Sequence, residues 1–188
     1  MNQDTILRLP LAALDDLLVQ ELKQQYGAAD VAVHLPAMPV NWLDEARFWQ
    51  IIGLLDWNKT GNDDAVLTPA VLALSVMPIA AIHQFEDILS EKLWRLDTPA
   101  HAKASLANRP QALLSVDGFL YDRCCVVANG KDFYEQVLQD PSKMPAGFAF
   151  GRLLSLASQA YQAKTGKQFI HIPQYAYETY SNEAAWGE

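Results

Sequence analysis

The chain has 188 residues, 51% of them hydrophobic and 19% charged, a composition typical of a packed globular protein and unlike that of a disordered chain. Its formal net charge is −8 at pH 7 and its basic residues form no run, so we expect it to bind neither DNA nor RNA, which are polyanions. No apolar run approaches the roughly 20 residues of a membrane-spanning helix, and the first residues lack the basic region of a signal peptide, so we expect a cytoplasmic protein without a membrane partner.

The first 40 residues are interpreted as a small element that precedes the main domain. Leucines at helical spacing predict a helix over Leu11–Tyr26, which Gly27 ends. A partial alternation of apolar residues then predicts a short strand over residues 30–35. We therefore divide the chain into an N-terminal helix-strand element, residues 1–40, and a helical domain, residues 41–188, and expect one compact structural unit overall.

Three helices are predicted in the next part of the chain. Asp44 is a suitable cap for a helix whose apolar stripe runs from Phe48 to Trp57. A polar loop follows over residues 58–64, and then a short, buried helix over Val66–Val76. Pro78 suits the first turn of a long amphipathic helix that continues to about residue 96, because proline's missing N–H does no harm there.

Four more helices are predicted from capping and stop signals. Their starts are placed at Thr98-Pro99, at a cap formed by Ser115 or Asp117, at Asp132, and near Phe150. The second ends at Asn129-Gly130, the third before Asp140-Pro141, and the last, a long helix, at Gly166.

A second short strand is predicted near the end of the chain. Residues 168–172 are rich in β-branched and aromatic side chains, and they could pair with Val31–His34. The predicted fold class is therefore mainly α, a compact multi-helix globular domain with a short minor β element formed by residues near 30–35 and 168–172.

The loop that begins at Asp56 resembles the start of a calcium-binding EF-hand loop. Asp56, Asn58 and Thr60 would supply oxygen ligands at the first, third and fifth positions. The pattern fails at the twelfth position, where a bidentate glutamate is required and Leu67 stands. We therefore predict a solvated loop between helices, with neither a metal site nor a cofactor.

Motifs of covalent catalysis are absent from the sequence. It contains neither a Gly-x-Ser-x-Gly elbow nor a phosphate loop that ends in Gly-Lys-Ser/Thr. Cys124 and Cys125 are adjacent, which disfavours a disulfide, and their apolar neighbours predict that they fill the core. The four histidines are scattered, His83 among them. No catalytic residue is assigned, and the balance favours a protein that is not an enzyme.

Arg123 is the charged residue whose position calls for a partner. It lies in an apolar predicted helix, where a buried guanidinium needs a carboxylate or carbonyl beside it. Asp122, Asp117 or a helix-end carbonyl could serve, and a structural ion pair is the expected role. With two aromatic residues these form the candidate functional or structural cluster, which comprises Trp49, Asp117, Tyr121, Asp122 and Arg123.

Several stretches of the chain match the pattern of a known family. They are Phe48-Trp49-Gln50-Ile51-Ile52, Phe85, the run from Ser115 to Tyr134, and Asp140-Pro141. The chain resembles the bacterial family named domain of unknown function 4240 over roughly residues 44–144. Cys125, where many members carry tryptophan, and Val116, in place of an acid, depart from that pattern. The resemblance implies a helical fold and carries no activity with it.

The sequence supports two alternative functions. The first is a non-enzymatic protein-interaction module of the bacterial cytoplasm with a basic protein partner, for example an immunity-type inhibitor that masks a basic toxin. The alternative is a small hydrolase or transferase that uses carboxylates with Arg123, Tyr121 or His83 in a cleft. A polar pocket at Arg123 would favour the enzyme, and an apolar surface patch rimmed by acids would favour the interaction module. The oligomeric state is left open.

Overall fold

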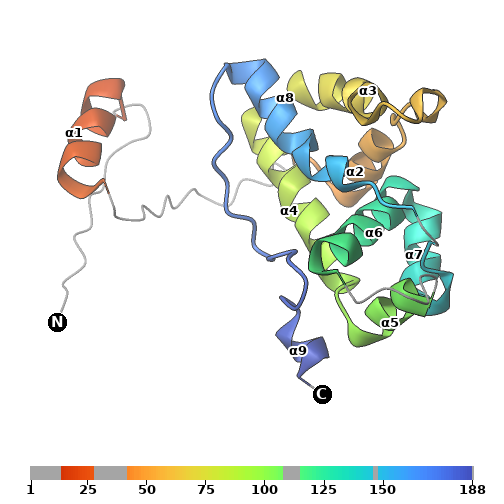
Figure 1. Cartoon of the computed structure of the whole chain (residues 1–188). Coiled ribbons are helices and arrows are strands. Elements are labelled where there is room, and N and C mark those ends of the chain that lie inside the picture. Colours follow the sequence, from red (N-terminus) through yellow and green to blue (C-terminus); the bar gives the residue numbers. More distant parts are fainter. Residues whose placement is uncertain (1–13, 28–41, 108–114, 146–147, 188) are drawn as a thin grey trace. The chain divides into compact units, whose positions relative to one another are not determined.

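A computed structural model describes residues 14–27, 42–107, 115–145 and 148–187 (Figure 1). The chain divides into two units, Met1–Val40 and Asn41–Glu188, and each is described by itself. In the first unit, helix α1 (Asp16–Tyr26) begins after Asp15, whose carboxylate accepts a hydrogen bond from a backbone N–H of the first turn at 2.9 Å. The strand predicted over residues 30–35 lies outside the described residues.

The second unit is built from helices, which confirms the predicted, mainly helical fold class. Its helices are α2 (Glu45–Ile52), α3 (Asp63–Ser75), α4 (Ile79–Arg95), α5 (Pro99–Ala107), α6 (Val116–Ala128), α7 (Lys131–Gln139), α8 (Leu156–Thr165) and α9 (Glu183–Trp186). Its described residues also contain three short 3₁₀ turns: η2 (Trp57–Lys59), η3 (Pro141–Lys143) and η4 (Gly151–Ser155). Within the part of the chain that the structure describes, no helix is both long and apolar enough to cross a bilayer.

Local signals place most helix ends where the sequence predicts them. Asp44 and Ser115 each accept a hydrogen bond from the backbone N–H three residues later, at 2.7 and 3.0 Å. Asn62 caps α3, so this helix begins before its predicted start and Pro69 lies inside it. Gly166 ends α8 with a φ of +68°, a left-handed conformation that glycine adopts without steric cost. The predicted long last helix opens with the 3₁₀ turn η4 instead of an α-helical turn.

The core of the second unit surrounds α4. Helix α4 packs against α2, α3, α6 and α8, and α3 packs along α8 (Figure 1). Phe48 of α2 and Phe85 of α4 are completely buried, with their ring centroids 4.9 Å apart. Leu67, Leu89 and Leu156 are buried around them, from α3, α4 and α8. The apolar stripes that predicted the helices therefore meet in one core.

The strand predicted over residues 168–172 is wrong, because this segment forms no β-ladder with any described residue. It is extended, and its side chains alternate as in a strand. Phe169 and His171 pack on α4 and α8, whereas Ile170 and Ile172 are 80% and 88% exposed. The alternation that predicted a strand arises because one side of an extended chain covers helices, which needs no second strand.

Candidate functional site

Arg123 lies on α6 with an exposed fraction of 0%. Its Nη1 donates a hydrogen bond to the carbonyl oxygen of Leu93 at 2.9 Å, and its Nη2 donates one to Oγ1 of Thr179 at 3.0 Å. Nη2 also lies 3.9 Å from Oδ1 of Asp97, and the guanidinium carbon lies 4.8 Å from the centroid of the Phe119 ring. Burial lowers the pKa of Arg123 and the Asp97 carboxylate opposes that shift, so the guanidinium stays charged.

The partners of Arg123 agree only in part with the predicted ones. The helix-end carbonyl is present, since Leu93 lies in the last turn of α4. The carboxylate beside the guanidinium belongs to Asp97, which the sequence did not single out. Thr179 comes from the far end of the chain, 56 residues after Arg123. No local pattern links residues at such separations, so only the tertiary structure could identify these two partners.

The remaining members of the predicted cluster have different surroundings. Asp122 is buried on α6 and accepts a hydrogen bond from a serine hydroxyl of α5. Asp117 is exposed in the first turn of α6, and Tyr121 is partly exposed beside η4. Trp49 lies on α2, where its indole N–H donates a hydrogen bond to the Glu45 carboxylate at 3.1 Å. These positions point to separate roles for the cluster members.

Lys92 on α4 is a second buried cation, and the sequence does not reveal it. Its Nζ lies 2.8 Å from the Glu45 carboxylate of α2 and 5.8 Å from the centroid of the Tyr134 ring. The hydrogen bond from Lys92 lowers the pKa of Glu45. A lysine on an amphipathic helix is ordinarily exposed, so its burial could not be predicted from the pattern. These contacts hold α2, α4 and α7 together, so Lys92 has a structural role.

The loop with the calcium-like pattern is organised by helix capping. Both the backbone N–H and the side-chain amide of Asn58 donate to the Asp56 carboxylate, each at 3.1 Å. Asp63 and Asp64 lie in the first turn of α3, and Asp64 accepts a hydrogen bond from Nε of Arg152 at 2.6 Å. Across the described ranges, no group of three or more His, Cys, Asp or Glu side chains is arranged to hold a metal ion.

The two cysteines fill core space, as predicted. Cys124 and Cys125 are both buried on α6 and remain free thiols. Burial raises the pKa of both thiols. Because the thiolate is the nucleophilic form, these cysteines are poorly suited to covalent chemistry in the folded protein.

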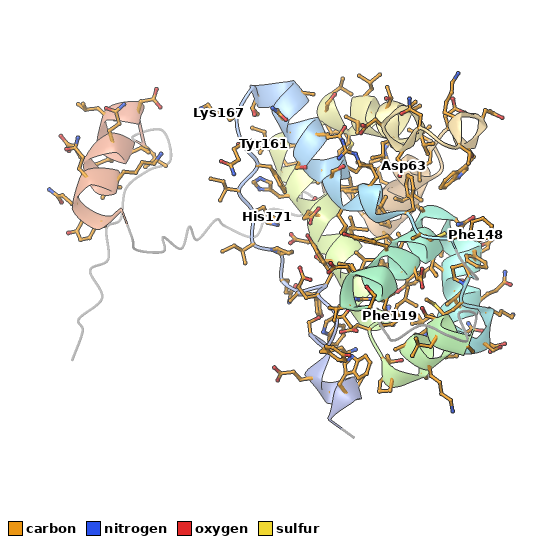
Figure 2. The ribbon with its side chains drawn as sticks, viewed as in Figure 1. Asp63, Phe119, Phe148, Tyr161, Lys167 and His171 are labelled. Atoms are coloured by element: carbon orange, nitrogen blue, oxygen red, sulfur yellow. The ribbon has the colours of Figure 1, made fainter. Side chains whose placement is uncertain are left out.

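An apolar groove of about 540 Å³ lies between η2, α3, α6, α7 and the segment before η4. We call it the aromatic groove. It is lined by Trp57, Thr60, Asp63, Val66, Cys125, Asn129, Phe133, Pro145, Phe148, Ala149 and Phe150. Trp57 is 42% exposed and Phe148 is 69% exposed, and the rings of Trp57 and Phe150 lie 5.2 Å apart. Asp63 is the one charged residue in this lining (Figure 2).

A second, more open cavity of about 560 Å³ adjoins the aromatic groove, with which it shares Asp63 and Ala149. Tyr121 lines it, and so brings one member of the predicted cluster to this surface. Its ring rests on Gly151, where a Cβ atom would lie 2.5 Å from the ring, so the position requires glycine. Together the two cavities form a continuous surface that is aromatic on one side and polar on the other.

The aromatic groove was missed at the level of the sequence. Phe148 lies in a loop, where no helical period marks it as part of a face. The apolar stripe predicted for the preceding helix includes Trp57, but α2 ends at Ile52 and Trp57 opens η2. Trp57 follows the end of α2, and Phe148 and Phe150 precede η4. Aromatic side chains in a connecting segment are the signal that could have found the groove, because a loop offers fewer neighbours to bury them.

The comparisons with known proteins place this architecture in a family. The model of the family described as protein of unknown function (DUF4240) matches residues 43–163, which is more than half of the chain. That span contains the whole lining of the aromatic groove and Arg123, whereas Thr179 lies beyond it. No curated protein and no solved structure matched the chain. The chain belongs to the DUF4240 family of proteins of unknown function.

Proposed function

We propose that this chain is a protein-binding module and that its aromatic groove holds an apolar segment of a basic partner protein. The observation that carries the proposal is the pair of exposed rings, Trp57 and Phe148, over a cavity large enough for side chains. Exposed aromatic residues around a concave apolar surface are typical of the centres of protein interfaces. Tryptophan in particular contributes large binding energies when a partner covers it.

The charge of the groove favours a basic partner. Asp63 is exposed, and among the described residues its carboxylate forms no ion pair and accepts no hydrogen bond, whereas its neighbour Asp64 is paired with Arg152. The net charge of −8 adds a long-range attraction for a cationic protein. The setting we propose is the bacterial cytoplasm, and the specific form is an immunity-type inhibitor that covers a basic toxin.

The burial of Arg123 supports this function over the alternative of a hydrolase or transferase. That alternative needs Arg123 in a cleft beside carboxylates, where a substrate could touch it. Arg123 has no exposed surface, and neither of the two cavities above is lined by it. Its hydrogen bonds to the Leu93 carbonyl and to Thr179 hold α6 against α4 and against the segment that contains Thr179.

Panning of a displayed library of random peptides against the whole chain tests the binding function. We expect enriched peptides that combine apolar or aromatic anchors with lysine or arginine. The variants Trp57→Ala and Phe148→Ser should weaken their binding at least tenfold, in keeping with the loss of a central aromatic contact. The matched control is Ile172→Ser, which removes an even more exposed apolar side chain outside the groove. Peptides that bind all three variants as well as the natural chain would contradict the proposal.

A reversal of charge at Asp63 tests the preference for a basic partner. Asp63→Lys should weaken the binding of the selected basic peptides, and the difference from the natural chain should shrink as salt screens the charges. Asp117→Lys is the matched control, because Asp117 also is exposed in the first turn of a helix and lines neither cavity. Titrations at low and high ionic strength measure both effects. Equal losses in the two variants would show that only the total charge matters.

A further inference from the structure

The last part of the chain lies on the helices as an extended strap, which we define as residues 168–182. It runs beside α4 toward that helix's C-terminal end (Figure 1). Its odd-numbered residues from Phe169 to Thr179 are partly or fully buried, and the even-numbered residues between them are exposed. The strap begins after the family-matched residues 43–163.

Every hydrogen bond that fastens the strap involves at least one side chain, since no backbone-to-backbone hydrogen bond joins its described residues to a helix of the domain. At its start, His171 contacts α4, and at its end Thr179 accepts a hydrogen bond from Arg123 while the Asn182 backbone N–H donates one to Asp97 at 3.1 Å. Between these anchors Tyr180 has a φ of +77°, a strained conformation for a residue with a side chain. Such a segment can separate from the domain without breaking a helix.

Glu86 lies under the strap on α4 and is the least satisfied charge there. Its exposed fraction is 5%, and its Oε2 has no hydrogen-bond partner among the described residues. The titratable groups that face it are Asp87 on α4, Cys124 on α6 and Tyr177 on the strap, none of which is a cation. Burial, with a contribution from Asp87, raises the pKa of Glu86 to about 7. Burial and the negative charge of Glu86 in turn raise the pKa of Tyr177 to about 12.

We propose that the strap is a pH-gated cover, which lies on α4 while Glu86 is protonated and lifts when Glu86 carries a charge. A buried carboxylate without a cation needs water, and the strap is the adjacent element that can move to admit it. The direction follows from linkage. The covered carboxyl holds its proton up to about pH 7, whereas a solvated one loses it near 4.5. A rise in pH across that interval therefore favours the lifted strap.

Two stacked histidines, His83 and His171, fasten the strap at its other end. The rings of His83 on α4 and His171 on the strap are stacked, with centroids 4.6 Å apart, and Tyr161 of α8 flanks His83 (Figure 2). His171 Nε2 lies 2.8 Å from the Asp87 carboxylate. Burial and the neighbouring His171 lower the pKa of His83. The covered position therefore disfavours a proton on His83, so acid favours the lifted strap at this end while alkali favours it at the other.

Lifting the strap would change what the surface presents. Thr179 would leave Arg123, and Asn182 would leave Asp97, so the buried ion pair would gain access to solvent. The gate therefore controls whether the one completely buried guanidinium among the described residues can meet another molecule.

Hydrogen exchange of the full chain, followed by mass spectrometry and corrected for the intrinsic dependence of exchange on pH, tests the gate. We expect exchange in peptides that contain the Asn182 amide, which donates to Asp97 while the strap is in place, to rise about tenfold between pH 6 and pH 8, the difference that a shift of the carboxyl pKa from about 4.5 to about 7 implies over that range. Peptides from α8 serve as the internal control for unfolding of the whole domain. The variant Glu86→Gln carries no titratable group at this position and should show no such rise.

The result expected from the gate differs from the result expected from unfolding of the whole domain. An equal rise in Glu86→Gln and in the natural chain overturns the gate, as does a rise of the same size in α8, which would mean global unfolding. Glu86→Met, an apolar side chain of similar length, replaces Glu86→Gln if the amide destabilises the fold. The variant His83→Gln should leave the alkaline rise in place and reduce the exchange seen below pH 6. A flat profile in the natural chain also overturns the proposal.

Discussion

Replacement of Arg123 with alanine is expected to lower the free energy of unfolding by about 3–5 kcal/mol, the usual cost of removing one partner of a buried ion pair. The substitution leaves Asp97 buried without its cation and leaves the Leu93 carbonyl without its donor. Thr179 loses its hydrogen bond to α6, so the strap should also be held less firmly. Urea denaturation at pH 7, followed by circular dichroism, measures the change.

Two further variants show whether the loss comes from the charge. Arg123→Lys keeps the positive charge but cannot donate from a planar fork to Leu93 and Thr179, so it should recover only part of the loss. The double variant Arg123→Met with Asp97→Leu removes both charges and should be more stable than Arg123→Ala. A loss below about 1 kcal/mol for Arg123→Ala would mean that water already reaches this network.

Replacement of Phe48 with alanine is expected to cost about 3–5 kcal/mol, because it opens a cavity in the centre of the core. Phe48 is completely buried and its ring touches two others, with centroids 4.9 Å from those of Trp49 and of Phe85. Aromatic contacts of this kind add to the cost of the lost apolar burial. The same denaturation experiment measures it.

The matched control is an aromatic residue of the groove. Trp57→Ala removes a larger ring, but one that is partly exposed, so its effect on the free energy of unfolding should be about 1 kcal/mol or less. The same variant should weaken peptide binding, whereas Phe48→Ala should not weaken it while the domain stays folded. A large loss of stability from Trp57→Ala would instead make the groove a part of the core and weaken the case for a binding surface.

Helices and their ends could be predicted from the sequence because their causes are local. A cap such as Asp44 or Ser115 acts on a backbone N–H three residues away, and Gly166 ends a helix through its own backbone freedom. Apolar residues at helical spacing need a core to face but not any particular partner. These rules apply whatever the rest of the chain does, and the helical fold class followed from them.

The error at residues 168–172 shows where local reasoning ends. Alternation correctly predicts an extended segment with one buried side, and Phe169 and His171 lie on that side. Whether the backbone also pairs with another strand depends on what lies next to it. Here the neighbours are the side chains of α4 and α8, which complete the packing without a ladder.

The sequence alone determined the negative net charge, the helices with their caps, and the burial of the adjacent residues Cys124 and Cys125. Each of these depends on composition or on residues a few positions apart. Only the tertiary structure decided the environment of individual charges and the location of a surface. It brought Asp97 and Thr179 into contact with Arg123. It also left Glu86 buried beneath the strap without a cation beside it. It also brought Trp57 and Phe148 to one groove. The physical reason is that a charge or an aromatic ring acts on whatever lies within a few ångströms, and the folding of distant segments sets those neighbours.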